Sequence, residues 1–391
     1  MDKICRPTTL RRSFEKVKAN RGAAGVDRQT IAMFEKRLDE NLETLSRQLR
    51  EGSYRPQAVR RVWIPKPGSK EKRPLGIPTV RDRVVQGALR MVVEPIYERD
   101  FAAHSYGFRP RRGCHDALGR VEDLLGEGYS YVVDADLKSY FDTIPHEPLL
   151  KRVAAKISDG RVLDLIKSYL TQSVMDGLQS WEPEEGSPQG AVISPLLSNL
   201  YLDPLDHGMA ASGWEMVRYA DDFVILCRSD EEARRALSAV QAWTAQAGLT
   251  LHPTKTRIVD ATREGFDFLG YHFERGHRWP REKSLQKLKD SLRAKTPRRT
   301  SGKSLHEIIT IVNRTTRGWF AYFQRSVANV FVDLDKWIRM RLRSILRNRQ
   351  HRRGRARGLD QNRWPNSYFA ELGLFSLSAA RAAVRPSSHG R

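Results

Sequence analysis

The chain has 391 residues, and its hydrophobic fraction of 40% is enough for a real core and for two or three domains. Its formal net charge of +22 favours a polyanionic partner, either nucleic acid or an anionic membrane surface. No stretch approaches the roughly 18 to 20 uncharged apolar residues that span a bilayer, so we expect no membrane partner.

The positive charge is concentrated in one part of the chain. Residues 281–357 contain 22 Lys and Arg against 5 Asp and Glu, a surplus of 17 in 77 residues. Such a local surplus is not explained by general solubility and indicates a binding surface for a polyanion.

The cysteines and the first residues indicate a reducing compartment. Cys5, Cys114 and Cys227 are too scattered for a disulfide framework or a four-ligand zinc site. The first 16 residues lack the apolar core of a secretory signal. We therefore expect a cytoplasmic protein.

The first third of the chain predicts helices around a pair of strands. Residues 8–50 alternate apolar and charged positions at helical spacing, interrupted by a glycine-containing loop at 20–27. Residues 58–86 predict a strand, a basic turn, a second strand and the entry to a helix. Two further helices are expected at 86–101 and 113–128.

The remaining elements change character near residue 280. In order, we expect a β-rich run at 129–137, helices at 145–169 and 194–209, two short strands within 214–229, an amphipathic helix at 230–249 and a strand at 266–273. Beyond about residue 281 basic helices take over, the clearest at 302–324. Most of the aromatic residues of this helix, which are Trp319, Phe320, Tyr322 and Phe323, are assigned to packing between helices. Mixed α+β sequence followed by all-α sequence indicates a domain boundary.

Two adjacent aspartates interrupt an apolar run in "RYADDFVIL", residues 218–226. If Asp221 and Asp222 occupy a hairpin turn, they emerge at the edge of a sheet, and "VVDADL" offers Asp136 at the end of a neighbouring strand. Three converging carboxylates repel one another unless a hard divalent cation lies among them, and oxygen ligands favour Mg²⁺. Two such ions about 3.5 to 4 Å apart can activate a 3′-hydroxyl and stabilise a leaving pyrophosphate. Taken alone, such a pair more often caps a surface turn, where Asp is common.

A family resemblance decides between these interpretations. The segments "DADLKSYFDTIPH", "GSPQGAVISPLLSNLYL", "RYADDFVIL", "GLTLHPTKT" and "FDFLGYHF" resemble the successive motifs of reverse transcriptases, in their order and approximate spacing. The particular residues of these motifs are similar to those of group II intron-encoded proteins, in the form without a C-terminal endonuclease domain. "IPKPGSKEKRPLGIPTVRDRVVQ" and "SYGFRPRRGCHDAL" resemble that family's finger motifs. The similarity runs from about residue 10 to the C-terminus.

The resemblance implies a set of site residues. Asp136, Asp221 and Asp222 would be the catalytic, metal-binding carboxylates for two Mg²⁺ ions, whereas Asp134 and Asp142 would not be ligands. Residues that would contact the incoming nucleotide are Lys66, Arg73, Phe141, Gln189, Gly190 and Lys255.

For several of these residues a structural interpretation stays open. Phe141 would exclude a 2′-hydroxyl, but it could also be a core residue. Lys66 and Arg73 would clamp a triphosphate, but a charge-rich turn is usually only solvated. Lys255 would serve as a possible acid for pyrophosphate departure, but could lie unused on the surface.

Nucleic-acid contacts are predicted from the basic segments. The expected residues are Arg109, Arg111, Arg112, Arg298, Arg299, Lys303, Arg314 and Arg317. Neutralising phosphates with such side chains gives an affinity that falls steeply as salt rises. The partners implied by the resemblance are an intron RNA template, a DNA primer or target, and deoxynucleoside triphosphates.

The predicted fold is α+β, a right-hand polymerase fold followed by an all-helical thumb or domain X. The limits expected are an N-terminal extension at 1–55, reverse transcriptase fingers and palm at 56–280, the helical thumb or maturase domain X at 281–350, and a basic arm with a short tail at 351–391.

The predicted function is that of an RNA-directed DNA polymerase that also binds its intron RNA to assist splicing and mobility. The protein would be a monomer or a dimer of bacterial cytoplasmic type, nucleoid-associated when bound to DNA. Two alternatives are a non-catalytic RNA-binding splicing factor and a host-adopted reverse transcriptase used in defence or repair. The first alternative is disfavoured because all three aspartates are present.

Overall fold

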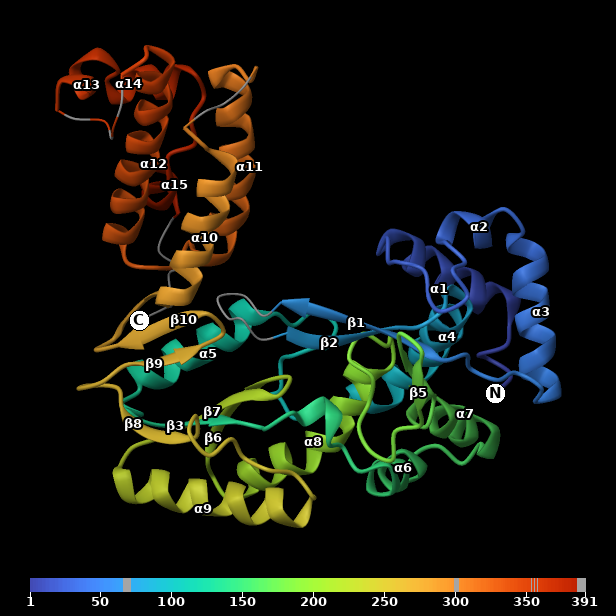
Figure 1. Ribbon diagram of the computed structural model, residues 1–391. Helices are drawn as coiled ribbons and strands as arrows, with labels where there is room; N and C mark the ends of the chain where they lie inside the picture. Colours follow the sequence, from blue (N-terminus) through green and yellow to red (C-terminus); the bar gives the residue numbers. More distant parts are fainter. Residues whose placement is uncertain (66–71, 299–301, 353, 355, 357, 385–391) are drawn as a thin grey trace. The chain divides into compact units, whose positions relative to one another are not determined.

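The computed structural model describes residues 1–391 except 66–71, 299–301, 353, 355, 357 and 385–391. The chain divides into two compact units, Met1–Asp260 and Ala261–Arg391 (Figure 1). Each unit has its own secondary structure and its own buried core.

The first unit begins with four helices, of which α1 packs against both α3 and α4. They are α1 (Pro7–Ala19), α2 (Ile31–Glu35), α3 (Leu38–Glu51) and α4 (Val80–Glu98). Leu10, Phe14 and Val17 lie on one face of α1 at helical spacing, and all three are buried where α1 packs along α4. The predicted loop at 20–27 is confirmed, since no helix or strand occupies it.

A four-stranded sheet in the order β2-β1-β4-β5 follows the helical part. Its strands are β1 (Val59–Pro65), β2 (Lys72–Ile77), β4 (Val174–Asp176) and β5 (Gln179–Trp181). The antiparallel β1–β2 pair was predicted. The β4–β5 pair was not, because strands of three residues are too short to show an alternating pattern.

A second four-stranded sheet, in the order β6-β7-β3-β8, forms the centre of the first unit. Its strands are β3 (Tyr131–Asp136), β6 (Glu215–Tyr219), β7 (Asp222–Cys227) and β8 (Arg257–Asp260). Helix α9 (Asp230–Gln246) runs along this sheet, and helices α5 (Cys114–Gly126) and α8 (Ser194–Ala211) pack against β6 (Figure 1). The five residues 223–227 are all buried, so β7 is the apolar centre of the sheet.

The helical region predicted at 145–169 consists of two helices. Helix α6 (His146–Ala154) ends before residue 155, and α7 (Gly160–Leu170) begins after Asp159, whose side chain accepts hydrogen bonds from the backbone of Arg161 and Val162. Asp159 is therefore the N-cap of α7. A short 3₁₀ turn, η1 (Tyr140–Asp142), connects β3 to this region.

The second unit combines a small sheet with a helical bundle. The sheet has the order β11-β10-β9, from β9 (Phe266–Phe268), β10 (Tyr271–Glu274) and β11 (His277–Pro280). The helices are α10 (Glu282–Lys295), α11 (Leu305–Phe323), α12 (Ala328–Arg349), α13 (Gly358–Arg363), α14 (Asn366–Glu371) and α15 (Leu377–Ala383). The expectation of helices beyond residue 281 is thus confirmed.

The prediction of one strand at 266–273 was wrong. Leu269 and Gly270 have φ angles of +47° and +84°, which turn the chain back so that β9 and β10 pair as a hairpin. An apolar run can hide such a turn, because only Gly270 marks it in the sequence.

The aromatic residues of α11 pack in two directions. Phe320 contacts Phe331 of α12, with ring centroids 5.4 Å apart, as expected for packing between helices. Tyr322 and Phe323 instead contact Tyr271 of the small sheet, at 5.9 and 5.0 Å. The small sheet therefore packs against the end of α11 and is part of the second unit, which begins 20 residues before the predicted helical region at 281. The four predicted domain limits stay predictions.

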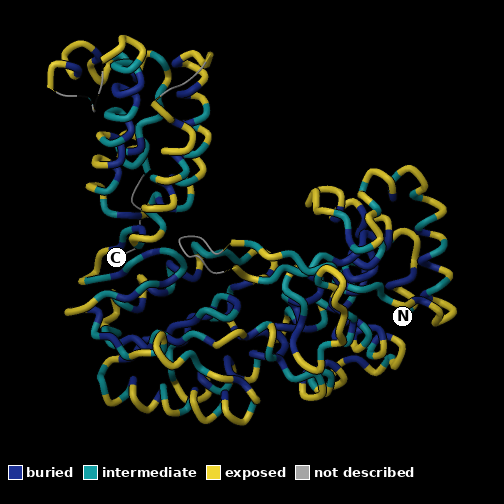
Figure 2. The backbone as a smooth tube through the Cα atoms, viewed as in Figure 1, coloured by how far each residue is buried: buried dark blue, intermediate teal, exposed yellow. Residues whose placement is uncertain are grey.

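Burial follows the helices of both units in stripes (Figure 2). In α12, Phe331, Leu334, Ile338, Leu342 and Ile345 are buried at helical spacing. In the described part of the chain, no helix is long and apolar enough to cross a membrane.

Shortening Phe331 should destabilise the second unit. Phe331 is fully buried and contacts Phe320, so Phe331→Ala should lower the free energy of unfolding by about 3 to 5 kcal/mol. The adjacent Val332 is 37% exposed, and Val332→Ala should change it by less than about 0.5 kcal/mol. Denaturant unfolding of the full chain, followed by circular dichroism, measures both; equal losses would contradict the assigned core.

Candidate active site

The two adjacent aspartates lie at the turn between β6 and β7. Tyr219 and Asp222 face each other across this hairpin, and Ala220 and Asp221 connect them. Ala220 has a φ of +62°, the left-handed conformation that a two-residue hairpin connection requires. The predicted hairpin with the aspartates at its turn is therefore what the structure shows.

Strand β3 brings the third aspartate to the same place. Its antiparallel pairing with β7 sets Asp136 directly opposite Asp222. Directly opposite residues project on the same face of a sheet, with Cβ atoms about 4.5 to 5.5 Å apart. Asp136 thus lies at the same end of the central sheet as the adjacent pair Asp221 and Asp222. Asp134 lies two residues back, opposite Val224.

The electrostatics of this end of the sheet are unfavourable for one carboxylate. Burial raises the pKa of Asp221, and the negative charge of Asp136 raises it further, while Arg218 and Lys255 lower it. The Lys255 Nζ atom lies 2.6 Å from Asp136 Oδ2 and supplies the nearest countercharge. The site is therefore one that gains from additional positive charge.

These residues fit a divalent cation that is shared with a substrate. Among the described residues, no group of three or more His, Cys, Asp or Glu side chains is arranged so that it could by itself hold a metal ion. Mg²⁺ does not require one, because it commonly binds one or two carboxylates together with waters and substrate phosphates. An opposed pair of carboxylates beside a third one supplies donors of that kind.

The segment after α9 places Lys255 beside Asp136. The backbone N–H of His252 donates to the Asp136 carbonyl at 2.7 Å, and that of Lys138 donates to the Thr250 carbonyl at 2.8 Å. Residues 250–252 therefore follow the end of β3. This local pairing, invisible in the sequence, is what brings Lys255 to the carboxylates.

Phe141 is held at the edge of a groove. It lies in η1, half-buried, with its ring 6.4 Å from that of Phe108 and 5.6 Å from that of Tyr140. It also lines a groove of about 440 Å³ together with Pro188 and Trp181. Phe141 thus both packs against the core and faces an open space, so its two interpretations are compatible.

Gln189 and Gly190 are joined to strand β2. The Gly76 N–H donates to the Gln189 carbonyl at 2.6 Å, and Gly190 has a φ of +108°. A Cβ atom on Gly190 would lie 2.4 Å from the Gly76 carbonyl oxygen, so only glycine allows this approach. Arg73 is exposed on the same strand β2. Lys66 lies outside the described residues.

The residues predicted to contact nucleic acid differ in their exposure to solvent. Arg111, Arg298, Lys303, Arg314 and Arg317 are exposed, and Arg112 is half-buried and donates to the Ala103 carbonyl. Arg299 lies outside the described residues.

Arg109 is a correction to the sequence analysis. Its side chain is buried and binds the Glu98 carboxylate at 3.0 Å and the Ala102 and Ser105 carbonyls at 2.6 and 2.9 Å. A guanidinium used in this way holds its own loop in place and is not available to a phosphate. The sequence could not show this, because buried and exposed arginines look alike in it.

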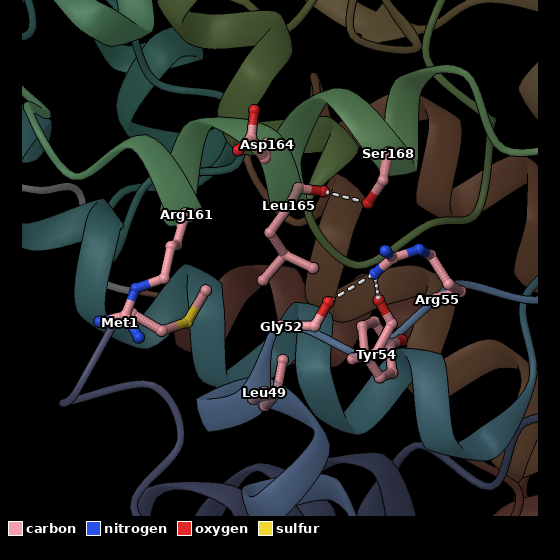
Figure 3. A pocket seen from close by; sticks show the side chains of 9 residues that line it. All are labelled: Met1, Leu49, Gly52, Tyr54, Arg55, Arg161, Asp164, Leu165 and Ser168. Carbon is pink, nitrogen blue, oxygen red and sulfur yellow. Dashed lines mark hydrogen bonds between the residues drawn. The ribbon is translucent and has the colours of Figure 1, made fainter.

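A separate cavity of about 360 Å³ lies between α3 and α7 (Figure 3). None of the predicted site residues lines it. Arg55 donates to the carbonyls of Gly52 and Tyr54, and Ser168 donates to that of Leu165. These polar groups of the lining are thus engaged within the protein, and we assign no ligand to this cavity.

Arg218 is a residue that sequence reasoning missed. It lies in the buried strand β6, is not exposed at all, and binds the carboxylate of Asp206 in α8. The signal was present, because a cation within an apolar strand needs a buried partner. The sequence gives no means of finding that partner.

Comparisons with known proteins agree with this geometry. The pattern of the reverse transcriptase (RNA-dependent DNA polymerase) family matches residues 64–273, more than half of the chain, and includes all three aspartates. The chain belongs to the reverse transcriptase family. The group II intron maturase-specific domain matches residues 285–364 of the second unit.

The match to individual relatives covers different shares of this chain and of each relative. The protein YkfC of Escherichia coli K12 is 36% identical over 313 residues, which are 70% of this chain and 82% of YkfC. The group II intron-encoded protein LtrA of Lactococcus lactis is 38% identical over 205 residues, 52% of this chain and 34% of LtrA. A putative COX1/OXI3 intron 1 protein of Saccharomyces cerevisiae is 27% identical over 368 residues, 78% of this chain and 43% of that protein.

These findings confirm the main predictions. The chain is an RNA-directed DNA polymerase of the group II intron type, with a maturase-specific domain, and its α+β polymerase fold is as expected. Reverse transcriptases use divalent metal ions and bind nucleic acid, so a cation and a nucleic-acid partner follow from the family.

Replacing Gly190 should disturb the close approach of residues 189–190 to β2. In Gly190→Ala the new methyl would collide with β2, and a shift of about 1 Å there should reduce primer extension on the order of 100-fold. Gly177→Ala is the matched control, because Gly177 also has a positive φ, +62°, but no neighbouring atom lies within 4 Å of the position that its new methyl group would take. Similar extension rates for the two variants would contradict the close approach.

Proposed function

We propose that this chain extends a DNA 3′ end with deoxynucleotides on an RNA template, using Asp136, Asp221 and Asp222 as ligands of two Mg²⁺ ions. The observation that carries the proposal is the register of β3 and β7, which sets Asp136 opposite Asp222 beside the turn that holds Asp221. The donors of all three side chains are carboxylate oxygens, which suit Mg²⁺ better than softer metals.

The bound ions would lower the pKa of the primer 3′-hydroxyl and neutralise the leaving pyrophosphate. The chain's own contribution is to hold the carboxylates before the reaction begins. The sheet fixes Asp136 and Asp222, and the hairpin turn fixes Asp221. The Lys255 Nζ atom donates a hydrogen bond to Asp136 Oδ2 at 2.6 Å, and Lys255 is the proposed proton donor to the departing pyrophosphate.

The remaining nucleotide contacts are assigned from their positions. Phe141, braced by Phe108 and Tyr140, is proposed to exclude a ribose 2′-hydroxyl. Gln189 and Gly190, tied to β2, are proposed to contact the nucleotide and the template. Arg73 on β2 is exposed and suits a bidentate phosphate contact, with Lys66 as its proposed partner.

The second proposed role is binding of intron RNA by the maturase-specific domain to assist splicing and mobility. Arg314 and Arg317 lie three residues apart on one exposed face of α11. Arg298 and Lys303 are exposed in the segment that precedes this helix. Together these cations provide phosphate contacts, which position RNA without reading its sequence. We propose a cytoplasmic protein that acts as a monomer or a dimer.

Removing a single metal-binding carboxylate should abolish synthesis. Asp221→Asn and Asp136→Asn should reduce dTTP incorporation on poly(rA)/oligo(dT) by about 1,000-fold or more, since several kcal/mol of charge stabilisation is lost and each 1.4 kcal/mol is about a factor of ten. Asp134→Asn, two residues away on the same strand, should keep most of the activity. Full activity in Asp221→Asn would refute the site assignment.

The same variants separate the polymerase from the splicing role. If the exposed cations of the second unit bind RNA, Asp221→Asn should retain RNA bound during purification, and sequencing should identify that RNA as intron-derived. A chain that binds no intron RNA, with its polymerase intact, would favour a host-adopted enzyme over an intron maturase.

The exposed arginines of α11 should contribute to template-primer binding by neutralising phosphate charges. Arg314→Gln and Arg317→Gln should each reduce the slope of log affinity against log salt for poly(rA)/oligo(dT) by about 1. Arg11→Gln removes one charge from an exposed side chain of α1, which pairs with Asp39, and should leave the slope unchanged. Equal effects of all three variants would show that net charge alone, not these positions, governs binding.

A further inference from the structure

The guanidinium of Arg218 is completely enclosed by hydrogen-bond acceptors. Its Nε and Nη2 atoms donate to the two carboxylate oxygens of Asp206, at 2.7 and 2.5 Å. Its Nη1 atom donates to Asn199 Oδ1 at 3.0 Å and to the Ala220 carbonyl at 2.8 Å. Its second Nη2 donor goes to Ser105 Oγ at 2.7 Å. All five N–H donors of the side chain are therefore used.

Stability alone is a poor explanation for this arrangement. Arg218 and Asp206 are both fully buried, and taking two charges out of water costs about as much as their attraction returns. An apolar pair of the same size would hold α8 and β6 together equally well. The bidentate fork gives something that apolar packing does not, namely a fixed position for whatever else the guanidinium contacts.

What Arg218 additionally contacts is the turn of the active site. Its Nη1 atom binds the carbonyl of Ala220, the residue that immediately precedes Asp221. Ala220 has a φ of +62°, a conformation that residues with a side chain rarely adopt, and it is buried. The bond to its carbonyl holds the peptide unit between Ala220 and Asp221 in this orientation.

The loop at residues 104–107 also packs against the turn. The Arg218 N–H donates to the His104 carbonyl at 3.0 Å, and the Tyr106 N–H donates to the Arg218 carbonyl at 2.8 Å, so this loop runs beside β6. A Cβ atom on Gly107 would lie 2.2 Å from the Ala220 nitrogen. Asn199 binds the Gly107 carbonyl at 2.8 Å while it also accepts from Arg218. The turn is thus held between Arg218 and Gly107.

We propose that Arg218 is a positioning residue for polymerisation: anchored by Asp206 and Asn199 of α8, it holds the left-handed Ala220 so that the Asp221 carboxylate points to the side of the sheet where Asp136 lies. The proposal rests on the proposed function, in which Asp221 is a metal ligand. Arg218 itself touches neither nucleotide nor metal and acts through the Ala220 peptide.

Arg218→Lys tests this role, because lysine keeps the charge but cannot make the fork. The variant should incorporate dTTP on poly(rA)/oligo(dT) with kcat reduced on the order of 10- to 100-fold, as expected for a misplaced reacting group. The Kd for the template-primer should change by less than about threefold, since Arg218 is buried and contacts no surface that could bind the duplex. Mn²⁺ binding without nucleotide, followed by electron paramagnetic resonance, should weaken in parallel.

The decisive measurement is rescue by glycine at position 220. Glycine adopts positive φ without strain, so Ala220→Gly in the Arg218→Lys background should recover roughly tenfold of the lost kcat. Arg343→Lys is the matched control: Arg343 is a buried arginine of α12 that donates to the Trp364 carbonyl at 2.9 Å and to Asn366 at 2.8 Å. Ala220→Gly should not recover any activity that Arg343→Lys loses.

The outcomes separate this proposal from the one it rests on. A folded Arg218→Lys with wild-type kcat, or a loss that Ala220→Gly does not rescue, would overturn the positioning role while Asp221→Asn remained inactive. Full activity of Asp221→Asn would overturn the proposed site itself. If Arg218→Lys does not fold, Ser105→Ala removes one bond from Nη2 without changing charge. Ser105→Ala should lower kcat, and Ala220→Gly should restore part of the loss. An unchanged kcat in Ser105→Ala would then overturn the proposal.

Discussion

The antiparallel pairing of β3 with β7 is the constraint on which the rest of the site depends. Because this register sets Asp136 opposite Asp222, it collects negative charge at one end of a sheet whose centre is otherwise apolar. Like charges at that distance disfavour each other, and the raised pKa of Asp221 is a consequence of burial and of this crowding. Lys255 offsets part of this negative charge, and the reverse transcriptase family uses divalent ions. The register of β3 and β7 therefore underlies both the unfavourable electrostatics of these carboxylates and the metal binding proposed for them.

Two neighbouring segments hold that end of the sheet in place. The segment after α9 pairs with the end of β3 and delivers Lys255, while α8 delivers Asp206 and Asn199 to Arg218 behind the turn. Buried cations and exposed cations therefore have opposite uses in this very basic chain. Arg109 and Arg218 use their donors inside the protein, on carbonyls and carboxylates. The exposed arginines of α11 leave theirs available to a polyanion. Net charge alone does not distinguish these groups.

The second unit shows how a basic surface can be carried by an ordinary apolar core. Rows of buried side chains hold α10, α11 and α12 together, and the aromatic residues at the end of α11 continue that core into the small sheet. The apolar residues of each helix face inward, and charged residues such as Arg314 and Arg317 of α11 are exposed between them, whereas Arg343 of α12 is buried. The match of the maturase-specific domain to residues 285–364 covers these helices.

The sequence by itself determined the family, the α+β order of elements and the helical second part, and it pointed to the three aspartates as candidates, because local patterns and motif order are written along the chain. It could not show that 266–273 turns back on itself, that β4 and β5 exist, or that Arg109 is buried, since three-residue strands and single arginines leave no periodic trace. Only the tertiary structure decided which distant residues meet: Asp136 with Asp222 and Lys255, and Arg218 with Asp206 and Ala220. The physical reason is that strand register and buried ion pairing depend on contacts between segments far apart in the chain, and no local propensity encodes them.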